Sequence, residues 1–241
     1  NMDLTYIGHA TFQIETNGTT LLFDPFFEGN PHTESAATDF DPDVVLVSHA
    51  HQDHYDDVDA YTGDDGPLII SNFEIITRIG QDYGHENVHP LNEGGTVDFE
   101  WGTVHGTHAR HTSSFPDGSY GGVPGGFVLE LDDGVVYYTG DTAPFAEMEW
   151  IGDAIDVDLM IAPVGDVVTM GVDGAVHTAE MVDPANIVPV HYDTFPFIEV
   201  DLDERERVVV NRDDVGGIDH LGRVDGPVDP HRHHVADRGD H

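Results

Sequence analysis

Short apolar runs alternate with polar loops over the first 200 residues, and this pattern predicts a mixed α/β fold. Apolar and polar positions alternate at 11–16, and the Asn17-Gly18 turn that follows predicts a hairpin. The unbroken apolar run Val44–Val47 is typical of a strand buried on both faces. The predicted strands span 4–7, 11–16, 20–23, 44–47, 68–70, 88–91, 96–99, 103–109, 126–131, 135–139, 159–162 and 187–190, and the helices span 72–83, 144–154 and 175–182.

The length of 241 residues is typical of one α/β domain with a tail. We assign the domain to residues 1–200. Six of the eight arginines lie in the remaining segment, 201–241, at positions 205, 207, 212, 223, 232 and 238. This change of composition marks 201–241 as a divergent C-terminal segment.

Acidic residues outnumber basic ones by 47 to 8, and the formal net charge is −39. Such a chain repels itself at ordinary ionic strength, but molar salt shortens the screening length to about 3 Å. The acids are spread along the chain, whereas an acidic surface for a basic partner would concentrate them in one patch. We therefore interpret the charge as that of a halophilic protein. Nucleic acid is not expected as a partner, because its phosphates require Lys and Arg.

The sequence has no cysteine, so a metal ion in this protein would be bound by His, Asp or Glu. It also shows neither an apolar stretch of 18 residues nor a signal peptide with a basic start. We therefore expect a cytoplasmic protein without membrane contact.

The motif His49-Ala50-His51-Gln52-Asp53-His54 directly follows the apolar run at 44–47. Several imidazoles crowded on one loop satisfy each other poorly unless a cation lies between them. A solvated histidine-rich loop is the alternative, but a buried strand leading into the motif favours a fixed geometry. The motif therefore predicts a metal site.

Metal-binding residue types also follow apolar strands elsewhere in the chain. His49, His111, Asp141 and His191 each come directly after one. Loops at the carboxyl ends of strands gather on one edge of an α/β sheet, which is the usual place for a site. We expect these four side chains to meet there.

The order of these residues resembles the metallo-β-lactamase superfamily. Within this superfamily, the sequence motifs are similar to those of an uncharacterised metal-dependent hydrolase family related to the L-ascorbate 6-phosphate lactonases. The shared motifs are Gly8-His9, Phe23-Asp24-Pro25-Phe26 with Gly29-Asn30-Pro31, Gly140-Asp141-Thr142, Gly165-Asp166 with Thr169-Met170-Gly171, and Val190-His191-Tyr192-Asp193-Thr194-Phe195-Pro196. The resemblance covers about residues 2–200 and implies an αββα four-layer sandwich.

The resemblance also implies a dinuclear centre of two divalent metal ions. His49, His51 and His111 would hold one ion, Asp53, His54 and His191 would hold the other, and Asp141 would bridge them. A shared carboxylate keeps two cations about 3.5–4 Å apart. The ligand types suit zinc, and manganese or iron also fit.

The activity implied is hydrolysis, in which a hydroxide between the ions attacks a small ester, lactone or phosphodiester. Asp53 would also orient the hydroxide, and His9 would bind the substrate or assist the leaving group. Asp24 has two interpretations, as a support for a ligand histidine or as a turn residue before Pro25.

Pocket-lining roles are expected for Asp166, Thr169 and Met170. The remaining histidines of the domain, at 32, 85, 89, 105, 108 and 177, are expected to be surface or packing residues.

Two other classes of function remain open. A non-catalytic, metal-stabilised binding or assembly module would have a filled coordination sphere, and a di-iron redox site would contain iron and absorb visible light. The partners expected for the hydrolase are a small-molecule substrate and other copies of the chain in a homo-oligomer.

Overall fold

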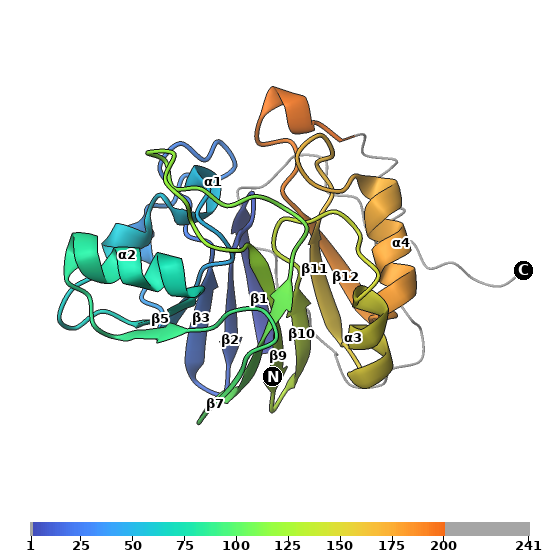
Figure 1. Cartoon of the computed structure of the whole chain (residues 1–241), viewed down its shortest axis with the longest axis horizontal. Helices are drawn as coiled ribbons and strands as arrows, with labels where there is room; N and C mark the ends of the chain where they lie inside the picture. Colours follow the sequence, from blue (N-terminus) through green and yellow to red (C-terminus); the bar gives the residue numbers. More distant parts are fainter. Residues whose placement is uncertain (1, 201–241) are drawn as a thin grey trace, which may run out of the picture.

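Two mixed β-sheets face each other in the computed structural model, which describes residues 2–200 (Figure 1). The predicted divergent segment 201–241 lies outside the described residues. Helices cover the outer faces of both sheets (Figure 1). The expected αββα sandwich is therefore confirmed.

The first sheet has the order β1-β2-β3-β4-β5-β6. Its first three strands are antiparallel, and the last four run parallel. Asn17 and Gly18 both have positive φ, 48° and 81°, as a tight hairpin turn requires. The strands are β1 Met2–Gly8, β2 Thr11–Thr16, β3 Thr19–Phe23, β4 Val44–Leu46, β5 Leu68–Ser71 and β6 Val88–Pro90.

The second sheet has the order β12-β11-β10-β9-β8-β7. Strands β7 to β10 are antiparallel neighbours, whereas β10, β11 and β12 are parallel. Since β8 and β10 are both antiparallel to β9, their carboxyl ends point the same way. The strands are β7 Thr96–Phe99, β8 Gly102–His108, β9 Gly125–Leu131, β10 Gly134–Tyr138, β11 Leu159–Pro163 and β12 Asn186–Val190.

The core between the sheets contains aromatic side chains from both of them. The rings of Phe12 and Phe23 stack with their centroids 4.4 Å apart. Tyr138, from the opposite sheet, meets the Phe12 ring edge-on at 5.0 Å. Burying such side chains stabilises the folded state by about 1.5–3 kcal/mol each. This aromatic contact fixes β10 against the N-terminal hairpin.

The helices bury one apolar face each. Ile75 and Ile79 of α2 join the cluster on the outer face of the first sheet, and Ala175 and Ala179 of α4 join that of the second. The side chain of Asn72 caps α2 by accepting a hydrogen bond from the Ile75 amide. The α-helices are α1 Gln52–Tyr55, α2 Phe73–Tyr83, α3 Met148–Ala154 and α4 Val172–Val182, and the 3₁₀ turns are η1 Ala37–Asp39, η2 Val58–Tyr61 and η3 Pro196–Ile198.

Helix boundaries differ from the predicted ones in three places. The prediction began α3 at 144 and α4 at 175, whereas they begin at Met148 and Val172. The short helix α1 was not predicted at all. No helix within residues 2–200 is both long enough and apolar enough to cross a membrane.

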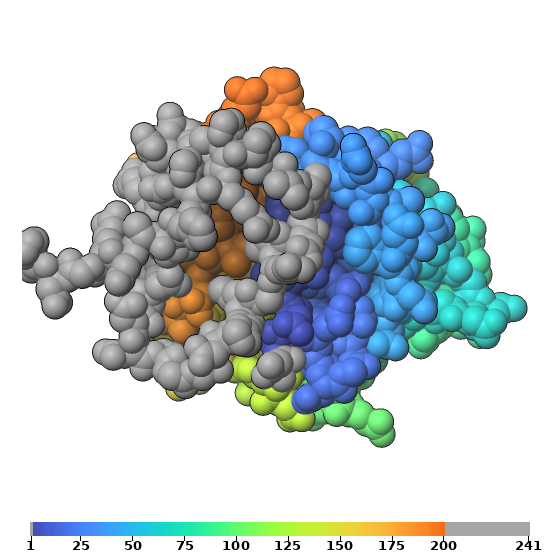
Figure 2. All heavy atoms as spheres, turned by 180° about the vertical axis from the view of Figure 1, so that it is seen from behind, coloured from blue at the N-terminus to red at the C-terminus, as the bar shows by residue number. Residues whose placement is uncertain are grey.

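One end of the sandwich collects the loops that follow β4, β8, β10 and β12 (Figure 1). Helix α1 and the turn η3 lie at this end (Figure 1). Seen from behind, the early residues in blue and the orange segment that includes η3 meet at the top of the molecule (Figure 2). Residues that are distant in the sequence are therefore neighbours there.

Within residues 2–200, Asp24 and Asp141 are the only acidic side chains that are fully buried, at 0% and 3% exposure. The other described carboxylates are half-buried or exposed. The acidic charge of residues 2–200 therefore lies mainly at the surface, where salt can screen it.

The charge distribution predicts that salt stabilises the fold. Raising KCl from 0.1 to 2 M is expected to raise the melting temperature by about 10 °C, because screening reduces repulsion between surface carboxylates. Calorimetry over a KCl series would measure this, with NaCl at equal ionic strength as the control. A melting temperature that stays constant or falls would show that surface repulsion does not limit stability.

Candidate metal centre

The motif at 49–54 is presented by β4 and α1. Strand β4 ends at Leu46, and the chain continues through the buried His49 into α1, which begins at Gln52. Asp53 and His54 occupy the first turn of α1, directly after His51 at its N-cap position. The change from strand to helix turns the first two histidines and the Asp-His pair toward different neighbours.

Three histidines form the first group of possible ligands. The Nδ1 atom of His51 lies 3.0 Å from His49 Nε2 and 3.2 Å from His111 Nε2. Burial lowers the pKa of all three imidazoles, and neighbouring histidines lower it further. Neutral imidazoles have a free lone pair, so this group is suited to bind a cation.

Asp53 lies at the centre of a second group. Its Oδ2 atom is 3.0 Å from His9 Nε2, 3.5 Å from His191 Nε2 and 3.9 Å from His54 Nε2. Burial opposes the charged carboxylate, but the surrounding imidazoles, His54 first among them, hold the pKa of Asp53 well below its usual range. Asp53 is therefore an ionised carboxylate surrounded by ring nitrogens.

Asp141 connects the two groups through one oxygen atom. Its Oδ2 lies 3.0 Å from His191 Nε2 and 3.2 Å from His54 Nε2 on one side. On the other side it lies 3.6 Å from His111 Nε2 and 3.9 Å from His49 Nε2. One carboxylate oxygen therefore lies between the two groups of possible ligands.

Charges within the cluster compensate each other. Burial disfavours every charged form, yet His191 and His54 hold the pKa of Asp141 well below its usual range. Burial lowers the pKa of His191 and His54, but the negative charge of Asp141 outweighs this effect. It raises the pKa of His191 to about 9 and that of His54 well above its usual value. The carboxylate of Asp141 thus favours the protonated form of both rings. Metal binding would replace those protons.

The donor atoms fit divalent cations. His54 Nε2 lies 3.2 Å from Asp141 Oδ2 but is buried without a hydrogen bond, which is uncommon for buried polar atoms. Within His49, His51 and His111, and likewise within His9, Asp53, His54 and His191, the possible ligand atoms all lie within 4.8 Å of one another. Nitrogen and carboxylate donors without thiolate suit zinc, manganese or iron.

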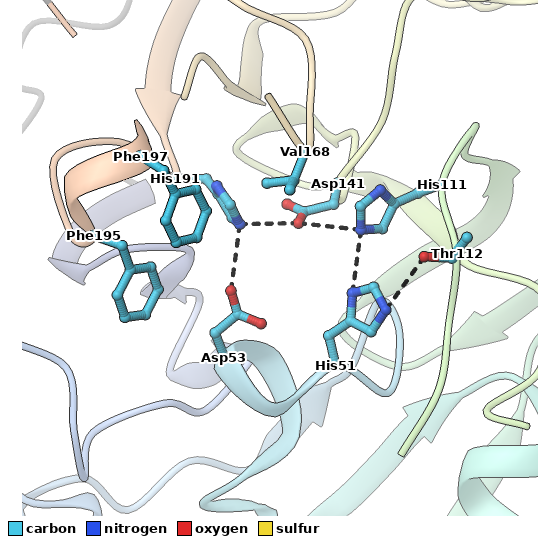
Figure 3. A pocket seen from close by; sticks show the side chains of 9 residues that line it. All are labelled: His51, Asp53, His111, Thr112, Asp141, Val168, His191, Phe195 and Phe197. Atoms are coloured by element: carbon cyan, nitrogen blue, oxygen red, sulfur yellow. Dashed lines mark hydrogen bonds and ion pairs between the residues drawn. The ribbon is translucent and has the colours of Figure 1, made fainter. Parts of the chain in front are cut away.

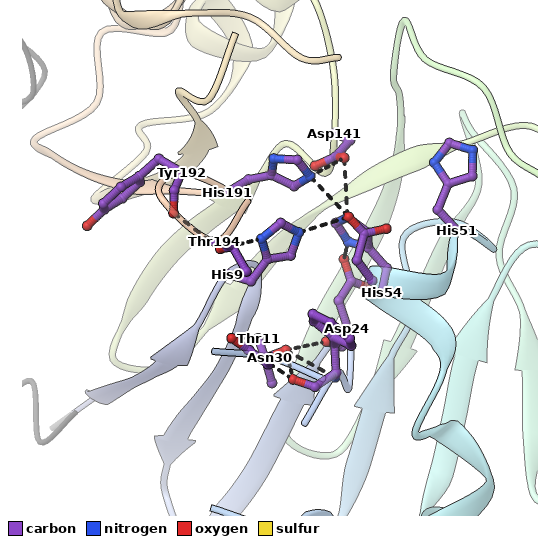
Figure 4. Close-up of polar contacts among 12 residues, drawn as sticks. His9, Thr11, Asp24, Asn30, His51, His54, Asp141, His191, Tyr192 and Thr194 are labelled. Atoms are coloured by element: carbon purple, nitrogen blue, oxygen red, sulfur yellow. Dashed lines mark hydrogen bonds and ion pairs between the residues drawn. The ribbon is translucent and has the colours of Figure 1, made fainter. Parts of the chain in front are cut away.

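Behind the histidines lies Asp24, which accepts hydrogen bonds from several groups at once. The Ser48 amide and hydroxyl donate at 2.7 and 2.6 Å, and the Tyr138 hydroxyl donates at 2.6 Å. His54 Nδ1 donates to Asp24 at 2.8 Å (Figure 4). Because the Ser48 hydroxyl donates to Asp24, it can accept from His49 Nδ1 at 3.0 Å. Both rings thus direct Nε2 toward the cluster, and Asp24 acts as a support rather than as a turn residue alone.

The structure places His9 behind Asp53 and away from the pocket. The ring is fully buried, and burial lowers its pKa to about 4. Nε2 donates to Asp53, because an ionised carboxylate can only accept, and Nδ1 lies 2.8 Å from the Thr194 hydroxyl. Both ring nitrogens are therefore occupied. The expected contact of His9 with substrate is not what the structure shows.

A cavity of about 470 Å³ opens over the cluster (Figure 3). The sequence prediction identified five of its lining residues, and Thr112, Val168, Phe195 and Phe197 were missed as such. Phe195 belongs to the motif that runs from Val190 to Pro196, whereas the positions of the other three side chains depend on loop conformation. The cavity is lined by His51, Asp53, His111, Thr112, Asp141, Val168, His191, Phe195 and Phe197.

The loop at 165–171 contributes a different residue from those predicted. Val168 lines the cavity, and Asp166, Thr169 and Met170 do not. Met170 is buried in the core beneath α4, and its sulfur accepts a hydrogen bond from Thr178. Helix packing thus draws Met170 away from the cavity.

The comparisons with known proteins agree with this geometry. Residues 3–191 match the model of the family described as "Beta-lactamase superfamily domain". A solved metallo hydrolase, Igni18 from Ignicoccus hospitalis, superposes with a TM-score of 0.76 at 32% identity, covering 85% of this chain and 88% of that one. The fold and the histidine–aspartate cluster thus define a protein of the metallo-β-lactamase superfamily.

Closer relatives narrow the assignment. The chain is 64% identical to a UPF0173 metal-dependent hydrolase of Salinibacter ruber over 205 residues, 85% of this chain and 91% of the relative. It is 40% identical to one of Thermus thermophilus over 200 residues, 83% and 88% of the two chains. The chain therefore belongs to the UPF0173 family of metal-dependent hydrolases, and the resemblance inferred from its motifs is confirmed.

The Asp24 network predicts a large effect of Asp24→Asn. The amide has one acceptor oxygen in place of two, so buried donors lose their partner, at a cost of about 2–4 kcal/mol of unfolding free energy. Zinc affinity is expected to fall by about 10–100-fold, because the ring orientation is lost. Urea unfolding in 2 M KCl and competitive chelator titration would measure the two effects.

The matched control is Asp43→Asn, since Asp43 is exposed and accepts a single bond from the Thr20 amide. Asp43→Asn is expected to cost under about 1 kcal/mol. Equal losses in the two variants would refute a special role for Asp24.

Proposed function

We propose that this family member is a dinuclear hydrolase that cleaves a small ester, lactone or phosphodiester. The observation that carries the proposal is the position of Asp141 Oδ2, within 4 Å of ring nitrogens from both ligand groups. We assign His49, His51 and His111 to one divalent ion, Asp53, His54 and His191 to the second, and Asp141 to both. Zinc is the first metal to test, followed by manganese and iron.

Two bound cations would supply Lewis acidity and would bring the pKa of a water near neutrality. The protein residues perform the remaining tasks. Asp53, 26% exposed at the cavity floor, can accept a hydrogen bond from the attacking water and hold that water in line with the substrate. Its low pKa keeps the carboxylate ionised, so it acts as a hydrogen-bond acceptor that orients the water. Thr112 can donate its hydroxyl to a substrate oxygen from the opposite wall (Figure 3).

His9 is proposed as a positioning residue for Asp53. Its short hydrogen bond fixes the direction of the carboxylate, and Thr194 fixes the ring from behind. A buried, neutral imidazole is suited to this task because it does not compete with a cation for the ligands. His9 therefore acts on the reaction through Asp53.

The open cavity favours catalysis over a structural metal site. Structural sites are closed by four protein ligands, whereas catalytic sites keep a position open to solvent. Here Asp53 and His51 are half-buried and line the cavity. A binding or assembly module would not require ligands that face a substrate-sized space.

We also propose that the enzyme works in a salt-rich cytoplasm, since surface charge of this size needs screening.

The central prediction concerns metal content and turnover. His49→Ala and Asp141→Asn are expected to lose hydrolysis by about 10³-fold or more, together with bound metal. Elemental analysis and an ester, lactone and phosphodiester panel in 2 M KCl would measure both quantities. The matched control is His177→Ala, an exposed histidine of α4 that is expected to change neither. Undiminished hydrolysis in both cluster variants would refute the proposal, as would wild-type protein without stoichiometric metal.

The role of His9 predicts selective loss of one metal. His9→Ala is expected to lower the affinity for the ion assigned to Asp53, His54 and His191 by about 10–100-fold, and to leave the other ion bound. Thr194→Val should shift affinity in the same direction to a smaller extent. Metal stoichiometry after dialysis against graded chelator would show one ion per chain in His9→Ala. Loss of both ions together, or of neither, would contradict this role.

A further inference from the structure

Resting on the hydrolase proposal above, we propose that the substrate is an uncharged carboxylic ester or lactone with an apolar substituent. The substituent would lie on one wall of the cavity, formed by Val168, Phe195 and Phe197, which we call the apolar wall. This narrows the substrate class in two respects: it excludes phosphodiesters and remote anionic groups, and it requires alkyl or aryl surface.

The apolar wall stands beside the metal cluster. The rings of Phe195 and Phe197 stack with centroids 5.8 Å apart and planes 7° from parallel. Both follow His191 within six residues, so β12 delivers a ligand and the wall together. Figure 3 shows the two rings on the His191 side and Thr112 on the opposite side. A substrate reaching the cluster therefore passes between an apolar surface and a hydroxyl.

Two side chains of the apolar wall are exposed to solvent. Phe197 is 56% exposed and Val168 45%. Apolar surface that is clustered and exposed beside a cavity is characteristic of a binding surface. A cavity of about 470 Å³ lies within the range of small-molecule sites, which is about 300–1,000 Å³.

The loop that presents Val168 is strained. Val167 has φ of 57° and Asp166 has φ of 59°, in the left-handed region that β-branched residues avoid. The loop is closed by a bridge between Gly165 and Gly171 and by the hydrogen bond from the Asp166 amide to the Met170 carbonyl. Backbone strain of this kind persists where the surrounding structure imposes it, and it concentrates at functional sites. Val168 is thus held over the cavity.

No arginine within residues 2–200 lines the cavity. Residues 2–200 contain two basic residues, Arg78 and Arg110, and neither belongs to its lining. Arg78 is paired with Asp82 and Asp117. A carboxylate or phosphate on the substrate, remote from the reacting carbonyl, would find no cationic partner among these residues. It would instead approach a strongly negative surface.

The reaction is a simple hydrolysis. The oxygen of water forms a bond to the carbonyl carbon, and the bond from that carbon to the alkoxy oxygen breaks. The alcohol leaves with one proton of the water, and the carboxylic acid releases the other proton to solvent. The apolar substituent takes no part in this exchange, so its contribution is to binding and orientation.

The test compares phenyl butyrate with two anionic analogues of similar size. Monophenyl succinate has a carboxylate on the acyl side, and 4-carboxyphenyl butyrate has it on the leaving-group side. With metal-loaded protein in 2 M KCl, where long-range repulsion is screened, kcat/KM for phenyl butyrate is expected to exceed both by at least about tenfold. An anionic analogue that is hydrolysed as well as phenyl butyrate would overturn the inference.

Variants test the wall itself. Phe197→Ala is expected to lower kcat/KM for phenyl butyrate by about tenfold, mainly through KM, because buried apolar contact is lost. Trp150→Ala is the matched control, since Trp150 is a 72% exposed aromatic residue on α3, away from the cavity. Size-exclusion chromatography accompanies both. If Phe197→Ala dissociates an oligomer and leaves ester selectivity unchanged, the wall is a subunit interface and the inference fails.

A binding measurement separates this inference from the hydrolase proposal. The ketones in which CH₂ replaces the ester oxygen cannot be hydrolysed, and calorimetry reports their affinity without turnover. The neutral ketone is expected to bind at least about tenfold more tightly than its two anionic analogues, and Phe197→Ala should remove most of this difference. Absence of metal-dependent hydrolysis with this ketone selectivity would refute the hydrolase alone. Hydrolysis without the selectivity would refute the substrate class alone.

Discussion

The burial of one carboxylate, that of Asp141, is the constraint on which the structure around the cluster depends. A buried charge is costly unless it is compensated, and four ring nitrogens lie within 4 Å of its Oδ2 atom. Compensation requires positive charge, either protons on the rings or cations between them. Loops from both sheets must converge on Asp141 to provide it. The convergence of β4, β8, β10 and β12 at one end of the sandwich satisfies this electrostatic requirement.

Asp24 connects the cluster to the core through its hydrogen bonds. It follows β3, its partners Ser48 and His54 follow β4, and Tyr138 reaches it from β10 across the sandwich. The same tyrosine packs on Phe12 in the core. One hydroxyl group thus joins aromatic packing between the sheets to the orientation of the imidazoles. Preorganisation of the site and stability of the fold are therefore coupled, and a change in either affects the other.

The sequence predicted the strands and the cluster better than it predicted the pocket. Apolar runs mark buried strands, and residue types limit which side chains can bind metal, so Asp141 could be proposed as a ligand before the fold was known. Helix α1 was missed because four residues give no periodicity. Val168 and Phe197 were missed because loop conformation, set by distant contacts, decides which side chain reaches the cavity. The place of His9 behind Asp53 depends equally on tertiary geometry.

The possible ligands are divided between the two halves of the chain. His49 to His54 follow the first sheet's β4, and the remaining three follow strands of the second sheet, ending with His191. During synthesis on the ribosome, the histidine motif therefore leaves the exit tunnel more than a hundred residues before its last partner. A nascent chain contains an incomplete chelator until β12 has docked. On the ligand assignment proposed above, complete metal binding is a late event that follows the docking of both sheets.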